Sequence, residues 1–121
     1  VCRFYGSVAP GPNSHFFTAE HAECDALRAR QLVPTPAAVP QWNYEGPGFL
    51  VTPATQNDAG TPSCPANTQP VFRGYNNAFT PAGKRPWDSN HRYATAPAAI
   101  DNLVTQFGWR NEGLVFCTPG Q

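Results

Sequence analysis

Histidine is the residue type in this chain best suited to acid–base chemistry, because imidazole titrates close to neutral pH. His15 and His91 stand in similar surroundings, each at the start of a short run that contains an aromatic residue and a threonine. With Asp88 or Glu112 as its partner, His91 could serve a small hydrolase. The sequence contains neither a Gly-x-Ser-x-Gly nor a His-Glu-x-x-His segment, the signatures of a nucleophile elbow and of a zinc protease. We therefore assign no catalytic residue, metal ion or cofactor, and keep the hydrolase, and a metal site at the histidines with Asp88, as alternatives.

Two glutamates offer a different reaction, because a pair of carboxylates can hydrolyse a glycosidic bond. Glu45 and Glu112 each precede a glycine, and an arginine, Arg3 or Arg73, recurs with each of them. This recurrence favours a structural ion pair between glutamate and arginine in each half of the chain. The histidines have a structural interpretation as well, as half-buried rings bonded to the backbone beside a helix start.

Aromatic side chains provide a third possibility, since a sugar ring can stack on them while polar side chains hydrogen-bond its hydroxyl groups. The candidate ligand-binding residues combine a polar loop around a tryptophan with aromatic and imidazole groups elsewhere: Trp87, Asp88, Asn90, Arg85, Tyr5, Tyr75, His15 and His91. Trp87 either contacts a ligand or covers the core beneath its loop, and the sequence leaves both open. Trp42 and Trp109 recur in the two halves, which favours core positions for them.

These residues belong to a pattern that occurs twice, in residues 1–51 and 70–118, with a polar linker at 52–69. The matching segments stand in the same order and are Val1–Tyr5 and Val71–Tyr75, Ser14–Thr18 and Asn90–Thr95, Trp42–Gly46 and Trp109–Gly113. The repetition predicts an α+β fold in which two pseudo-symmetric halves, each strand–strand–helix–strand–strand, form one domain over residues 1–121. We expect antiparallel strand pairing, and the strand order stays open.

Hydrophobic patterning and turn residues place the elements of each copy. In the first copy the predicted strands are 1–5, 15–18, 42–45 and 49–51, and the helix is 19–30. In the second copy the predicted strands are 71–75, 91–94, 109–112 and 114–118, and the helix is 96–107. Thr18 and Thr95 are the predicted N-terminal caps, and Gly108 ends the second helix.

Four cysteines without a Cys-x-x-Cys pair favour disulfides over a zinc ribbon or a redox motif, with buried thiols as the alternative. Cys2, Cys24 and Cys117 fall at positions that are apolar in the other copy, so they should face the interior. We favour a Cys2–Cys24 disulfide, which joins a strand to the helix of its own copy, and this leaves Cys64–Cys117. Disulfides indicate an oxidising compartment, so we expect an exported protein.

The bulk composition limits the partners. The 121 residues carry a formal net charge of zero, and charged residues make up 13%, about half of the usual share. A chain without a basic stripe is a poor partner for nucleic acid, whereas a weakly charged polar surface suits neutral polymers. No apolar run approaches the roughly 18 residues of a membrane span. The absence of methionine indicates a processed or excised piece, and we expect a monomer.

The repeated segments resemble a bacterial secreted repeat family of unknown function, whose repeats read Tyr-Arg-Phe-Tyr-Asn, His-Phe-Tyr-Thr, a helix with a glutamate, Gly-Trp and Glu-Gly. The matching residues are Arg3–Tyr5, His15–Thr18, Glu23 and Glu45–Gly46 in the first copy, and Val71–Arg73, Tyr75–Asn76, Asn90–Tyr93, Gly108–Trp109 and Glu112–Gly113 in the second. The resemblance covers nearly the whole chain, although Gly74 and Ala94 depart from the pattern. It implies an accessory domain of an exported protein, without catalytic residues of its own.

We therefore predict a secreted, extracellular, non-catalytic binding module for carbohydrate or cell-wall polymer, linked covalently to the other domains of a larger protein. Two alternatives stay open. One is the small hydrolase that uses His91 with Asp88 or Glu112, which activity screening would test. The other is a structural spacer whose repeated residues serve packing alone, which a glycan array would test.

Overall fold

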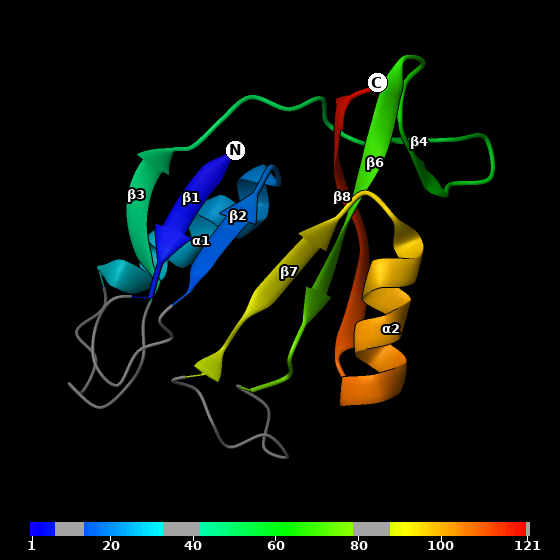
Figure 1. The fold of residues 1–121 in the computed structure, drawn as a ribbon. Helices are drawn as coiled ribbons and strands as arrows, with labels where there is room; N and C mark the ends of the chain where they lie inside the picture. The colour runs from blue at the N-terminus through cyan, green and yellow to red at the C-terminus, as the bar shows by residue number, and fades with distance from the viewer. Residues whose placement is uncertain (7–13, 33–41, 79–87, 121) are drawn as a thin grey trace. The chain divides into compact units, whose positions relative to one another are not determined.

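The computed structural model describes residues 1–6, 14–32, 42–78 and 88–120. These residues form two helices and three small sheets, shown in Figure 1, so the predicted α+β class is confirmed. The chain divides into two compact units, residues 1–49 with 76–91 and residues 50–75 with 92–121. Each unit is described by itself below.

The sheet of the first unit consists of β1 (Cys2–Tyr5), β2 (His15–Thr18) and β3 (Asn43–Pro47). The strand order is β2-β1-β3, and both pairs are antiparallel. Phe4 lies opposite Phe16, and Tyr5 lies opposite His15. Because side chains alternate along a strand, the two phenylalanines point to one face of the sheet and Tyr5 and His15 to the other.

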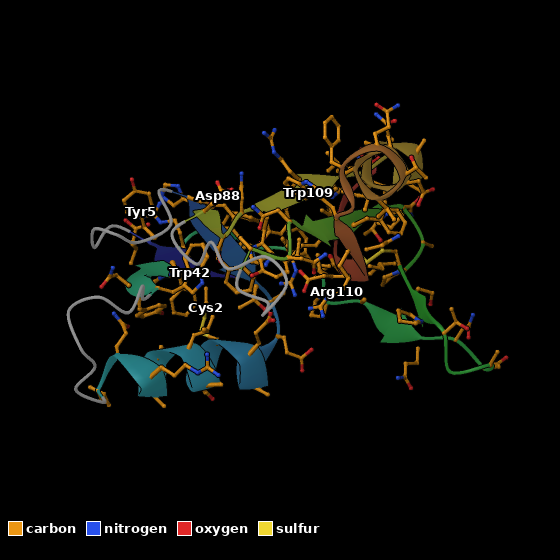
Figure 2. The ribbon with its side chains drawn as sticks, turned by 90° about the horizontal axis from the view of Figure 1, so that it is seen from below. Cys2, Tyr5, Trp42, Asp88, Trp109 and Arg110 are labelled. Atoms are coloured by element: carbon orange, nitrogen blue, oxygen red, sulfur yellow. A yellow bond between two sulfur atoms is a disulfide. The ribbon has the colours of Figure 1, made fainter. Side chains whose placement is uncertain are left out.

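Helix α1 (His21–Gln31) covers the face that carries Phe4 and Phe16. These two side chains are buried together with Cys24, and partly buried hydrophobic groups pack against them: Cys2, Leu27, Trp42 and Tyr44. The Cys2–Cys24 disulfide ties β1 to α1, with Cα atoms 6.1 Å apart. Figure 2 shows Cys2 and Trp42 on the side of the sheet that faces this helix.

The second unit contains a small sheet of two short strands and a sheet of three longer ones. Its elements are β4 (Thr55–Gln56), β5 (Pro62–Ser63), β6 (Thr68–Tyr75), β7 (His91–Ala94), α2 (Pro97–Phe107) and β8 (Arg110–Pro119). The orders are β4-β5 and β7-β6-β8, and β7 starts with His91, which belongs to the first unit. Helix α2 packs on β6 and β8 through Ile100, which is 1% exposed. A Cβ atom at Gly74 would lie 3.4 Å from Ile100 Cγ2, an ordinary contact distance, so α2 packs directly on β6 at this point.

A second disulfide joins Cys64 to Cys117 of β8, with Cα atoms 5.8 Å apart. Cys117 is completely buried, and its backbone exchanges two hydrogen bonds with Thr52. Both disulfides pair the cysteines as the sequence analysis favours, so the alternative of buried thiols is wrong. Of the helices in the described residues, α1 and α2, neither is long and apolar enough to cross a membrane.

Both three-stranded sheets contain a shift of strand register beside a glycine. The pairing of β1 with β3 shifts after Arg3, which lies opposite Gly46 at φ +97°. The pairing of β6 with β8 shifts after Val71 and again after Arg73, and Arg73 lies opposite Gly113 at φ +78°. A residue with a Cβ atom rarely adopts such a positive φ, so the shifts after Arg3 and Arg73 depend on glycine.

Several predicted strand boundaries are wrong. Residues 49–51 form no strand. β3 ends at Pro47, although Gly48 N–H still donates to the carbonyl of Val1 (2.9 Å). Residues 109–112 and 114–118 do not form two strands. Residues 110–119 form β8 instead, in which Gly113 pairs with Arg73 and the register shift leaves Glu112 without a partner residue on β6. The linker at 52–69 contains β4 and β5, which the sequence analysis did not predict. Strands this short and polar show no hydrophobic alternation.

The predicted helix caps are also wrong in position. The Thr18 hydroxyl accepts a hydrogen bond from the N–H of Glu20 (3.0 Å), but Glu20 is itself the N-cap of α1. The N-cap of α2 is Ala96, and neither helix has a side-chain cap at this end. Gly108 ends α2 in the left-handed conformation, as predicted.

Candidate functional site

Four neighbouring rings of the first unit form what we call the aromatic row: Tyr5, His15, Phe17 and Phe49. Ring centroids are 4.7 Å apart for Tyr5 and His15, 5.9 Å for His15 and Phe17, and 5.4 Å for Phe17 and Phe49. The side chain of His15 is 49% exposed and Phe49 is 45% exposed, so the row reaches solvent. Figure 2 shows Tyr5 on the side of the sheet away from α1, as strand alternation requires.

Charged groups lie beside the aromatic row. Glu45 Oε1 lies 3.3 Å from Arg3 Nε and 3.2 Å from His15 Nε2. The predicted pair of Arg3 with Glu45 is therefore confirmed, and His15 joins it. The three side chains are between 34% and 49% exposed. Since a guanidinium has five donors and a carboxylate about four acceptor sites, this group retains capacity to hydrogen-bond a ligand.

The opposite face of the same unit contains a hollow of about 260 Å³ against α1, which we call the α1 hollow. Its lining residues come from β2, α1, the segment before β3 and the start of β7: Phe16, Glu23, Ala26, Leu27, Arg30, Trp42 and His91. Ala26 and Arg30 are exposed, so the hollow is accessible along the helix. Within this lining, Glu23 is the only carboxylate and Arg30 is the only guanidinium.

Three rings meet inside the α1 hollow. The ring centroid of Phe16 lies 4.7 Å from that of His91 and 5.7 Å from that of Trp42, and the latter two are 6.1 Å apart. Phe16 is 4% exposed, whereas Trp42 and His91 are half-buried. Trp42 thus packs against the core, as predicted for a recurring tryptophan, and lines the hollow as well.

The described ends of the polar loop predicted to carry a ligand site are joined by hydrogen bonds. Asn76 Nδ2 donates to the carbonyl of Asp88, and the N–H of Asn90 donates to Asn76 Oδ1 at 3.1 Å. Ser14 Oγ donates to Asn90 Oδ1 at 3.1 Å. The side chain of Asn90 therefore contributes to structure, whereas Asp88 is exposed. The predictions for Trp87 and Arg85 fall outside the described residues.

In the second unit, a glutamate is enclosed by two arginines. Glu112 Oε1 lies 2.7 Å from Arg73 Nε, and its Oε2 lies 3.3 Å from Arg110 Nη2. The second predicted ion pair is therefore confirmed. The Arg110 guanidinium also lies 5.8 Å from the ring centroid of Tyr75, another predicted ligand-binding residue.

The structure thus distributes the predicted site residues over several places. Tyr5 and His15 meet in the aromatic row, His91 lines the α1 hollow, and Asn90 and Asp88 lie in the polar loop. The sequence analysis missed Phe17 and Phe49 of the row and the charged rim of the hollow. Strand alternation could have identified Phe17, which follows His15 by two residues. No comparable signal existed for the hollow, because its walls come from segments far apart in the sequence.

The described part of the chain contains no group of three His, Cys, Asp or Glu side chains that could hold a metal ion. A family model described as "Domain of unknown function (DUF5648)" matches residues 1–120. The chain belongs to this family. Because the match spans both units, the DUF5648 domain includes both disulfides, the aromatic row and the α1 hollow. No curated protein and no solved structure matches the chain.

Proposed function

We propose that this DUF5648 domain is a secreted, non-catalytic binding module for a neutral carbohydrate or cell-wall polymer, and that it serves as an accessory part of a larger bacterial protein. The observation that carries the proposal is the aromatic row. Its rings follow one another at 4.7, 5.9 and 5.4 Å, so they form an unbroken strip. Successive sugar rings of one polymer chain can place their apolar faces on such a strip.

The groups around the row suit an uncharged, hydroxyl-rich ligand. Arg3 and His15 can donate hydrogen bonds and Glu45 can accept them, while their charges offset one another. The whole chain has a formal net charge of zero, which gives no field to attract a polyanion. Two disulfides support export, because such bonds persist in oxidising compartments.

The non-catalytic part of the proposal is supported by the state of the two repeated glutamates. Glu45 is engaged by Arg3 and His15, and Glu112 by Arg73 and Arg110. The ion pairs account for the recurrence of both glutamates without a glycosidic reaction. The hydrolase alternative, in which His91 acts with Asp88 or Glu112, is tested by activity screening of the domain.

The proposal includes an internal duplication, in which residues 1–51 and 70–118 derive from one ancestral repeat. Three observations support it. The strand orders β2-β1-β3 and β7-β6-β8 correspond in chain order, both sheets shift register at a glycine, and both contain an Arg–Glu pair across that shift. The duplication is tested in an experimental structure by superposing the sheet and helix of one copy on those of the other. It is rejected if a single rotation and translation cannot superpose both the sheet and the helix.

A polysaccharide array followed by titration of the best polymer tests the function. Phe49→Ala and His15→Ala should each weaken binding roughly three- to tenfold, since a ring contact is worth about 0.5–1.5 kcal/mol. Phe107→Ala is the matched control, because Phe107 is 67% exposed and lies on α2, outside the row. Equal affinities of the wild type, Phe49→Ala, His15→Ala and Phe107→Ala would reject the row as the site. An array without any bound polymer would reject the function and favour a structural spacer.

A further inference from the structure

The α1 hollow and the aromatic row occupy opposite faces of the same three-stranded sheet. Phe16, in the hollow, belongs to the face covered by α1, and its neighbours His15 and Phe17 belong to the row. A polymer chain that lies on the row therefore does not pass through the hollow. The ligand of the hollow must therefore be considered separately from the ligand of the row.

We propose that the α1 hollow is a second binding site, which takes a single uncharged sugar ring, such as a chain end or a branch. This inference rests on the proposed carbohydrate function. The volume of the hollow, about 260 Å³, sets the size of the ligand. It lies just below the roughly 300–1,000 Å³ of sites that enclose drug-sized ligands. One six-membered ring with its substituents matches this volume, and the rest of a longer chain would lie outside the hollow.

The lining supplies both kinds of contact that a sugar ring requires. The half-buried ring of Trp42 offers apolar surface to a face of the sugar that carries C–H groups, and the buried ring of Phe16 supports it at 5.7 Å. The methyl groups of Ala26 and Leu27 extend this surface along α1. The ligand thus has an apolar floor on the sheet side and an aliphatic wall on the helix side.

The polar contacts stand at the two ends of the hollow. Glu23 and Arg30 are seven residues apart on α1, or about 10.5 Å along the helix axis. A carboxylate has about four acceptor sites and a guanidinium five donors, so both can bind hydroxyl groups in addition to their existing contacts. Because the two charges are opposite and lie at opposite ends, the hollow has no excess charge that would favour an ionic ligand.

The test fills the hollow without removing a core side chain. Ala26→Phe places a ring in the hollow, and Ala29→Phe places the same ring on an exposed position of α1 that does not line it. Neutral methyl glycosides are titrated into the full chain while the amide signals of α1 and the indole signal of Trp42 are followed by NMR. We expect dissociation constants in the millimolar range for one ring. Ala26→Phe should weaken binding at least tenfold, and Ala29→Phe should leave it within twofold.

Further variants separate this inference from the proposed function. Glu23→Gln and Arg30→Gln should weaken glycoside binding severalfold, whereas Phe49→Ala in the row should not change it. If a polymer binds the row but no glycoside shifts the signals of the hollow at tens of millimolar, only the second site is rejected. Equal glycoside binding by Ala26→Phe and Ala29→Phe would reject it as well. Signals that respond to a zwitterionic amino acid and to no glycoside would overturn the ligand class.

Discussion

Two ion pairs of the same residue types differ in burial, and burial determines what each contributes to stability. In the second unit the side chains of Arg73 and Glu112 are 8% and 15% exposed, with Nε and Oε1 2.7 Å apart. In the first unit those of Arg3 and Glu45 are 42% and 34% exposed, at 3.3 Å. Removing one partner of a buried pair leaves a charge without compensation, whereas water compensates an exposed one.

We therefore expect Arg73→Ala to lower the free energy of unfolding by about 3–5 kcal/mol, and Arg3→Ala by at most about 1 kcal/mol. Urea unfolding followed by circular dichroism measures both. Arg110→Ala serves as a control in the second unit, because Arg110 is 62% exposed although it contacts the same glutamate. Similar losses for Arg73→Ala and Arg3→Ala would contradict this account.

At the scale of the element, the sequence predicts strands better than it predicts their ends. The bounds of β2 and β7 agree with the prediction, because alternating residues and adjacent polar residues define them locally. β3 runs to Pro47, beyond the predicted end at residue 45, and β8 continues through Gly113. In both cases the pairing with the neighbouring strand decides the outcome. The start of α1 at His21 likewise depends on the backbone geometry after β2, which a capping preference does not reveal.

The glycine at each register shift gives a prediction for β3 and β8. A Cβ atom at Gly46 or Gly113 would meet nothing within 4 Å, so the cost of a substitution comes from the backbone alone. Gly46→Ala and Gly113→Ala should each lower the free energy of unfolding by about 1–2 kcal/mol because of the positive φ. Asparagine tolerates this conformation better, so Gly113→Asn should cost less than Gly113→Ala in thermal unfolding. Equal losses for alanine and asparagine would point to a cause other than the backbone angle.

At the scale of the whole molecule, the class, the disulfides and the ion pairs follow from recurrence in the sequence, whereas the hollow does not. Cys2 pairs with Cys24 over a separation of 22 residues, within one copy. The hollow brings His91 to Phe16, which are 75 positions apart and stand in different copies of the pattern. Comparing the two copies cannot reveal such a contact, because it identifies equivalent positions and not neighbouring ones.

The two disulfides give a prediction on the order of their effects. The closed loops span 22 and 53 residues, and the loss of loop-closure entropy corresponds to about 3.4 and about 4.2 kcal/mol. The double variant Cys64→Ala with Cys117→Ala should therefore be less stable than Cys2→Ala with Cys24→Ala. Complete burial of Cys117 adds to this difference, because the substitution leaves a cavity. Denaturation curves of the two double variants measure the order, and the reverse order would contradict the loop-length argument.

The charge of the whole molecule yields a prediction on salt. With eight acidic and eight basic residues and a ligand without charge, binding gains nothing from long-range attraction. We expect the affinity for the polymer to change by less than about twofold between 50 and 500 mM sodium chloride. A polyanion would release counterions on binding, and its affinity would fall by orders of magnitude over this range. Titrations at both salt concentrations distinguish a neutral polymer from an acidic one, and Arg3→Gln serves as a control for the local charge at the row. A steep fall that Arg3→Gln reduces would show that the row recognises an acidic polymer and would reject the neutral one.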